Sequence, residues 1–139
     1  TIDKNKRDTY VEDAKRMITL AEYKVRSDTN IELPTSGNCI VVPLGSLDLS
    51  DFNEGPEGGD YDLVKSYVVI ARSGSSYLYY AAIVENFDGE TRGIPLTSRD
   101  DLNKENARNE VASGSELNIV TPTIGSRLSG YTVTNIIDS

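Results

Sequence analysis

The sequence predicts an α+β domain in which one long N-terminal α-helix packs on an antiparallel β-sheet, with a second, short helix. Three observations predict this class. An apolar stripe with helical spacing crosses the first 28 residues, strand-like segments separated by tight turns fill residues 65–97, and the helical and strand-like parts are segregated along a chain without internal repeats. The 139 residues, 37% hydrophobic and 26% charged, indicate one globular domain over residues 1–139.

The first element, residues 1–28, is predicted as a helix because residues 3–28 contain no Gly or Pro and carry apolar side chains on one face. This stripe consists of Val11, Ala14, Ile18, Ala21 and Val25. At 1.5 Å per residue the helix would be about 39 Å long, which exceeds the roughly 30 Å width of a small domain. Because residues 1–9 lack the stripe, we expect the N-terminal turns to stand away from the core.

Three large side chains of this helix lie off its apolar stripe. Ile2, Leu20 and Tyr23 project away from the centre of the stripe, toward the opposite side of the helix. Either a loop of the same chain or another chain must then cover them. They are the candidate subunit-interface residues of this sequence.

Residues 29–64 are predicted as a long irregular region because Gly and Pro recur through it, with residues 39–42 as its one plausible strand core. Cys39 is interpreted as a small buried hydrophobic side chain of that strand. Six acidic residues and no basic residue fall between residues 48 and 62: Asp48, Asp51, Glu54, Glu57, Asp60 and Asp62. This pattern favours a solvated acidic face. Calcium remains a weak alternative, because residues 51–53 begin like a calcium loop but Gly55 stands where the next ligand should be.

Residues 65–97 are predicted as a β-meander. Residues 66–71 and 77–84 are rich in β-branched and aromatic side chains, and the turn at 73–75 makes them a hairpin. A second turn at Asp88 and Gly89 leads to a third strand near 91–96, which Pro95 places at an edge or keeps short. The hairpin carries Tyr67, Tyr77, Tyr79 and Tyr80. These rings either pack against the core and across strands, or form a surface for a ligand.

The C-terminal third is predicted as a short helix followed by strands. Ser98 is a suitable N-cap for a helix within residues 98–112, and Gly114 follows its expected end. In residues 113–139 the segments 116–120 and 131–137 are predicted as strands around a loop.

Composition excludes several classes of function. The net charge of −8 disfavours nucleic acids and anionic membranes as partners. The lack of histidine and the single cysteine exclude zinc sites of the usual kinds and Ser-His-Asp catalysis. We find no nucleophile elbow, phosphate-binding loop or dinucleotide fingerprint. We therefore expect no enzymatic activity and no cofactor, with a carboxylate pair from residues 48–62 as the remaining catalytic alternative.

The opening of the chain resembles a known family. The chain begins in the middle of a helix, which is followed by an irregular region, the hairpin at 67–84 and the C-terminal strands. The helix begins with Asn5-Lys6-Arg7-Asp8-Thr9-Tyr10-Val11-Glu12-Asp13-Ala14-Lys15 and continues to Val25. This layout resembles the soluble headgroup of a type IV pilin or pseudopilin without its hydrophobic N-terminal half-helix. That half would lie upstream of Thr1, so contact with a membrane is expected only through it.

The resemblance implies a non-enzymatic structural subunit of a type IV pilus, competence pilus or secretion pseudopilus. Such a subunit is assembled from a membrane-anchored precursor, is displayed at the cell surface, and binds identical or homologous subunits through its N-terminal helix. Many Gram-negative pilins close their C-terminal region with a disulfide, which a chain whose one cysteine is Cys39 cannot do, so a Gram-positive subunit is implied.

A second interpretation remains open. The chain could be a secreted binding or adhesion module that recognises a glycan, calcium or a host protein through the tyrosine hairpin and the acidic loop. A free-standing module of this kind should have its own helix cap near residue 3.

Overall fold

The computed structural model describes residues 2–52 and 54–138. Helix α1 (Lys4–Ser27) is followed by a sheet whose principal strands are β1 (Asn38–Pro43), β3 (Tyr67–Ser73), β4 (Ser76–Phe87), β5 (Glu90–Ser98) and β8 (Tyr131–Ile136). The short elements are β2 (Asp60–Tyr61), α2 (Arg99–Leu102), β6 (Ala112–Ser113), β7 (Arg127–Leu128) and the 3₁₀ turns Leu44–Ser46, Leu49–Asp51, Ala107–Glu110 and Gly114–Leu117.

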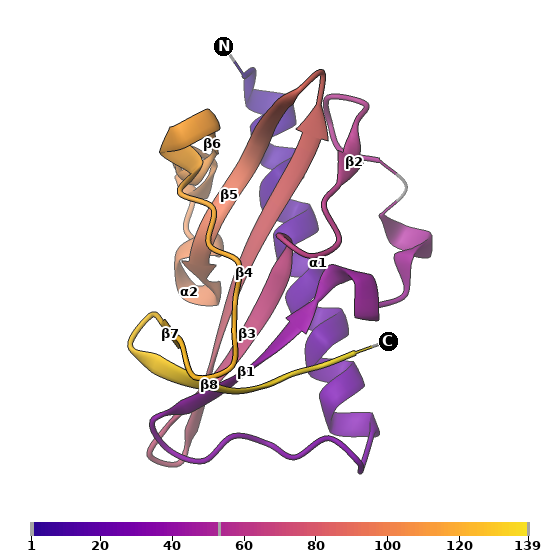
Figure 1. The fold of residues 1–139 in the computed structure, drawn as a ribbon. Coiled ribbons are helices and arrows are strands. Elements are labelled where there is room, and N and C mark those ends of the chain that lie inside the picture. The colour runs from indigo at the N-terminus through magenta and orange to yellow at the C-terminus, as the bar shows by residue number, and fades with distance from the viewer. Residues whose placement is uncertain (1, 53, 139) are drawn as a thin grey trace.

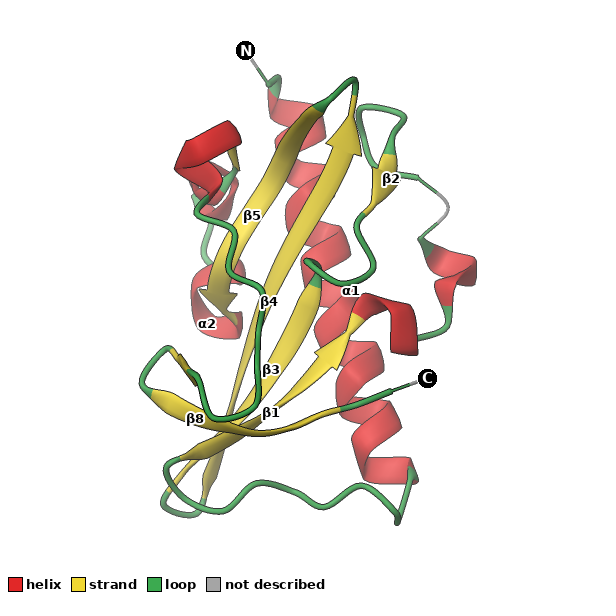
Figure 2. Ribbon diagram, viewed as in Figure 1, coloured by secondary structure: helices red, strands yellow, loops and turns green. Residues whose placement is uncertain are grey.

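The sheet has the strand order β6-β5-β4-β3-β1-β8-β7, with β2 paired to β4. Neighbouring strands are antiparallel except β1 and β8, which are parallel. Figure 1 shows α1 running along one face of this sheet, while the chain between β6 and β8 crosses the opposite face. The predicted α+β class is therefore confirmed, and the sheet is mostly rather than wholly antiparallel (Figure 2).

The predicted apolar stripe packs on the sheet. Val11, Ala14, Ile18, Ala21 and Val25 are all buried. They join one core cluster with alternate side chains of the strands, among them Ile40, Val42, Val68, Ile70 and Ile83. Because side chains of a strand alternate between its two faces, the residues between these ones form a second cluster on the opposite face, with Cys39, Val41, Val69 and Ala82.

The N-terminal end of α1 does not stand away from the core, so that expectation is wrong. Ile2 is buried, and the Arg7 side chain donates to the carbonyl oxygens of Ile2 at 2.9 Å and of Arg108 and Val111 at 3.2 Å. The Arg108 guanidinium in turn donates to Asp8 at 2.9 Å. Hydrogen bonds of polar side chains thus hold the first turns of α1 on the rest of the fold. The pattern of apolar residues cannot predict such contacts.

The helix fits within the domain because the domain is elongated along the helix axis. Strand β4 has 12 residues, which span about 40 Å at 3.3 Å per residue. The 24 residues of α1 span about 36 Å. The longest strand and the helix therefore match in length, and neither end of the helix has to project beyond the sheet.

The C-terminal elements differ from the prediction in two places. The helix expected within residues 98–112 is only α2, capped by Ser98, and a separate 3₁₀ turn follows at Ala107–Glu110. Leu102 and Ala107 are both buried, and because residues five apart lie on different sides of one α-helix, the helix has to break between them. The strand expected at 116–120 is absent; Gly114–Leu117 is a 3₁₀ turn that ends at Asn118 in the left-handed conformation.

The other strands are confirmed, but β5 is not short: it has nine residues and lies between β4 and β6, and it is the outermost strand only beyond Gly93, where the pairing with β6 has ended. The turn at Asp88 and Gly89 has both residues at positive φ, as a two-residue hairpin turn requires. Pro95 lies in β5 at a β-bulge, where the pairing shifts between Ala81 opposite Thr97 and Ile83 opposite Ile94. A proline is tolerated there because the bulge interrupts the hydrogen-bonded ladder.

Candidate functional site

The three candidate interface residues differ in exposure. Ile2 is 9% exposed and belongs to the core cluster, so its own chain covers it, which is one of the two alternatives given above. Its contact with a neighbouring subunit stays a prediction. Leu20 is half-buried and packs against the same core. Tyr23 is 73% exposed and is the most exposed large hydrophobic side chain of the described residues. Of the three, Tyr23 alone offers a large surface to another molecule.

Tyr23 lies beside an ordered group of charges. It lines a shallow, open depression of α1 together with Glu22 and Arg26. Glu22 pairs with Arg26 at 2.8 Å and with Arg99 at 3.0 Å, and the Arg99 guanidinium lies 4.4 Å from the centre of the Tyr79 ring. Although partial burial acts to raise it, the pKa of the Glu22 carboxyl is held below its usual value by the hydrogen bond from Arg99 and the positive charges nearby. The residues around the Tyr23 ring are therefore charged or polar, although mostly their carbon atoms face the depression.

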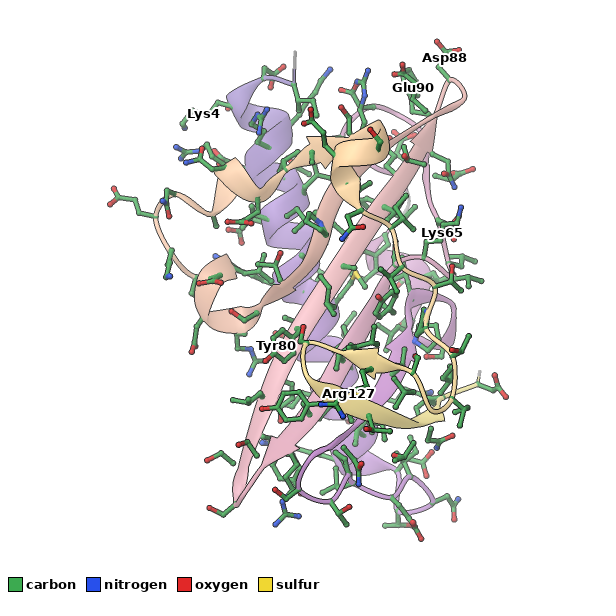
Figure 3. All side chains as sticks on the ribbon, turned by 60° about the vertical axis from the view of Figure 1, so that its left-hand side comes forward. Lys4, Lys65, Tyr80, Asp88, Glu90 and Arg127 are labelled. Atoms are coloured by element: carbon green, nitrogen blue, oxygen red, sulfur yellow. The ribbon has the colours of Figure 1, made fainter. Side chains whose placement is uncertain are left out.

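The four tyrosines of the hairpin do not share one surface. Tyr77 and Tyr79 pack against the helix-side core, whereas Tyr67 and Tyr80 belong to the cluster on the opposite face. The Arg72 guanidinium lies 5.2 Å from the centre of the Tyr77 ring. Figure 3 shows Tyr80 on the side that the C-terminal segment approaches. Of the two interpretations of these rings, the arrangement favours packing.

A buried carboxylate joins the acidic loop to the helix and the sheet. Glu85 of β4 has an exposed fraction of 0%. Its carboxylate accepts hydrogen bonds from the Tyr10 hydroxyl at 2.7 Å, from the Gly59 amide at 2.7 Å and from the Glu57 amide at 3.2 Å. Since the donors come from α1 and from the loop before β2, this one side chain holds three parts of the chain together.

A second buried pair lies next to the first. The Tyr61 hydroxyl donates to Asp13 at 2.5 Å, and the Tyr61 ring meets the Tyr10 ring edge-to-face with 6.5 Å between centres. Nearby, Glu57 pairs with Lys6 at 2.6 Å and also with Arg92. The acidic loop is thus attached to α1 through hydrogen bonds and ion pairs.

These two networks were not predicted from the sequence, although part of the signal is visible in it. Asp13 follows Tyr10 by three residues and precedes Met17 by four, so it lies on the buried face of the helix and needs a buried partner. Glu85 directly follows the apolar run 81–84. The identity of the partners could not be read from the sequence.

The pKa of Asp13 leads to a testable dependence on pH. Burial raises this pKa above its ordinary value, and the bond from Tyr61 only partly offsets the effect. Because the pKa of Asp13 is higher in the folded than in the unfolded chain, protonation of Asp13 stabilises the folded state. This contribution to the free energy of unfolding is lost as pH rises through the folded-state pKa. The free energy of unfolding of the wild type, relative to that of Asp13→Asn, should increase as pH falls from about 7 to 4. Urea unfolding of both chains across this range measures the difference, and a constant difference would contradict the assignment.

The remaining candidates are placed as follows. Cys39 is buried, its Sγ lies 3.8 Å from the Tyr131 carbonyl oxygen, and burial raises its pKa to about 11, which fits the predicted packing role. Of the calcium-like segment 51–53, Asn53 and the side chain of Asp51 lie outside the described residues. Within the residues the structure describes, no three His, Cys, Asp or Glu side chains are grouped as a metal site requires.

The fold and its surfaces define an α+β domain with one long helix on one face of the sheet, an exposed tyrosine on that helix and a loop attached through buried carboxylates. Among the described helices, none is both long and apolar enough to cross a bilayer. Comparison with family models, with curated proteins and with solved structures finds no match for this chain.

Proposed function

We propose that this chain is the headgroup of a non-enzymatic structural subunit, of the type IV pilin or pseudopilin kind, that assembles into a filament at the cell surface. The observation that supports this proposal is the position of α1, a helix of 24 residues that lies along one face of the sheet and leaves Tyr23 exposed. A long helix with one buried face and one free face suits a subunit whose helix contacts its own head on one side and neighbours on the other. A pilus, a competence pilus and a secretion pseudopilus all fit this proposal, in a Gram-positive cell.

The proposed mechanism is packing. A membrane-anchored precursor carries the apolar half of the helix upstream of Thr1, and this half drives polymerisation. Asp3 is the N-cap of α1 here, with φ −71° and ψ 166°, and its side chain accepts from the Lys6 amide. Continuation of the helix through Asp3 therefore requires this residue to exchange its cap conformation for a helical one, at a cost of about 1 kcal/mol for the lost cap.

The test uses the full gene product in its own cell. The residues encoded before Thr1 should include about 20–25 predominantly apolar residues, and filaments sheared from the cell surface should contain this chain. Tyr23→Glu should reduce the sheared filaments about tenfold while the melting temperature of the 139-residue chain stays unchanged, because the ring is exposed in the monomer. Thr123→Glu, an exposed position outside α1, is the matched control.

Two results would contradict the proposal. One is a gene whose upstream residues hold no apolar segment. The other is a full-length protein recovered only as a monomer from the culture medium.

A second candidate function is a secreted binding or adhesion module. The cap at Asp3 and the burial of Ile2 favour it, because a free-standing domain is expected to close its helix in this way. Calcium titration by calorimetry, together with a screen of surface glycans, distinguishes the two candidates: binding accompanied by a higher melting temperature supports the module.

A further inference from the structure

The sheet face opposite α1 carries a partly open pocket of about 240 Å³. Its apolar lining comes from the sheet, through Ala82, Val84 and Ile94, and from the segment that crosses the sheet, through Leu117 and Leu128. Figure 1 shows this segment passing in front of β3, β4 and β5, on the side away from the helix. The pocket thus lies between two layers of the fold and outside the surface that carries Tyr23.

The residues that line this pocket also include two basic ones, Lys65 before β3 and Arg127 in β7. Nine of the 14 basic residues of the chain pair with an acidic side chain among the described residues, and these two do not. The Arg127 guanidinium donates to the Thr132 hydroxyl at 3.2 Å and to the Gly130 carbonyl at 2.5 Å, both neutral acceptors. Lys65 is half-buried and Arg127 is exposed, so both charges stand at the pocket without an ion-pair partner and without being fully buried.

The carboxylate of Asp62 does not neutralise Lys65 by direct contact. Its oxygens accept from the backbone amides of Val64 and Lys65 and from the Asn86 side chain, at 2.8 to 3.0 Å. The positive charge of Lys65 still contributes to lowering the pKa of Asp62, after these hydrogen bonds. The ammonium group therefore remains available for a second anion.

Tyr67 adds a third polar group to the pocket lining. The residue is 1% exposed, and among the described residues its hydroxyl has no hydrogen-bond partner. Its oxygen is not among the fully buried side-chain atoms that lack a partner, so the hydroxyl is open to the pocket. A ligand oxygen in the pocket would supply that partner.

We propose that this pocket binds a small amphipathic carboxylate, with its apolar body against the sheet and its carboxylate paired with Lys65 and Arg127. The size agrees with this class of ligand. An apolar protein cavity of about 150 Å³ holds benzene, so about 240 Å³ has room for a body of that size and a carboxylate. The inference does not depend on the proposed filament function, since the pocket is on the opposite face of the sheet from α1.

The test is calorimetric titration of the 139-residue chain with hexanoate, benzoate and the neutral analogue hexanol. For ligands of this size we expect the acids to bind with a dissociation constant of about 1 mM, and hexanol about tenfold more weakly. Lys65→Gln and Arg127→Gln should each weaken hexanoate binding about tenfold, because each removes one charged partner. Tyr67→Phe should weaken it less, since a neutral donor contributes less than a charged one.

Two further variants locate the binding. Lys104→Gln is the matched control, since Lys104 is an exposed lysine that pairs with Asp101 at 2.7 Å next to α2, and it should leave the affinity unchanged. Ala82→Leu places extra carbon atoms in the pocket and should abolish hexanoate binding while all charges stay in place. The melting temperature of each variant shows that the fold persists.

Several outcomes would overturn the proposal. It fails if no acid binds at about 20 mM, well above the expected constant. It also fails if hexanol binds as tightly as hexanoate, or if Ala82→Leu leaves the affinity unchanged. Concentration-dependent dimerisation that Arg127→Gln abolishes, without any binding of free acids, would assign the pocket to a second copy of the chain instead.

Discussion

Glu85→Ala is expected to lower the free energy of unfolding by about 3–5 kcal/mol. The carboxylate is fully buried and accepts from the Tyr10 hydroxyl and from the amides of Gly59 and Glu57. Alanine cannot accept these bonds, so buried donors lose their partner and a cavity opens beside the helix. Urea unfolding monitored by circular dichroism at neutral pH measures the loss.

Matched variants separate the network from the general effect of losing a glutamate. Glu54→Ala removes an exposed side chain of the same loop region and should change the free energy of unfolding by less than about 0.5 kcal/mol. Tyr10→Phe removes one donor and should cost about 1–2 kcal/mol. The double variant Tyr10→Phe/Glu85→Ala should lose less stability than the sum of the losses of the two single variants, because the two residues share a hydrogen bond. Equal, small losses for Glu85→Ala and Glu54→Ala would contradict the proposed role of Glu85.

Gly93→Ala is expected to cost about 4 kcal/mol or more, or to prevent folding. Gly93 has φ +154°, and a Cβ atom there would lie 1.9 Å from the Ile83 carbonyl oxygen. This oxygen belongs to the backbone of the neighbouring strand, where Val84 pairs with Gly93 and Ile83 with Ile94. Relief of the collision would therefore require β4 and β5 to separate beside the bulge. Thermal and urea unfolding provide the measurement.

Gly74→Ala is the matched control for backbone strain without collision. Gly74 has φ +62° in the turn between β3 and β4, and nothing lies within 4 Å of a Cβ built there. The expected cost is about 1–2 kcal/mol, which is that of a left-handed non-glycine residue. If the two alanine variants were equally stable, the close approach at Gly93 would not be the cause of its effect.

The two buried networks have a consequence for the acidic loop. A loop rich in Gly and acidic side chains is expected to be poorly ordered, because its charges repel and its backbone has many accessible conformations. Here Glu85 accepts from two of its backbone amides, and Glu57 pairs with Lys6 of α1 and with Arg92 of β5. The loop before β2 is thereby attached to the N-terminal half of the helix.

The local elements could be predicted from the sequence to a large degree. The helix was predicted at 3–28 and is Lys4–Ser27, and the two hairpin strands were predicted at 66–71 and 77–84 and are Tyr67–Ser73 and Ser76–Phe87. These elements depend on the period of the apolar residues and on turn residues, which neighbours in the sequence define. The strands were longer than predicted because pairing extends through polar residues such as Glu85 and Asn86.

The candidate site could be predicted only in part. That Tyr23 lies off the buried stripe follows from helical geometry, and the residue is exposed. Helical geometry also places Ile2 off the stripe, yet this side chain is buried, and Arg7 nearby binds carbonyl groups more than 100 residues away. A periodicity describes which way a side chain points, and not whether a distant segment covers it.

The sequence by itself determined the α+β class, the long amphipathic helix, the meander and the buried character of Cys39. Only the tertiary structure decided that β1 and β8 are parallel neighbours, that the N-terminal turns are docked, and that Lys65 and Arg127 line one pocket. The physical reason is separation along the chain. Backbone preference and apolar spacing act between near neighbours, whereas Tyr10 and Glu85 form their bond across 75 residues, and such a pair depends on where the folded sheet places both ends.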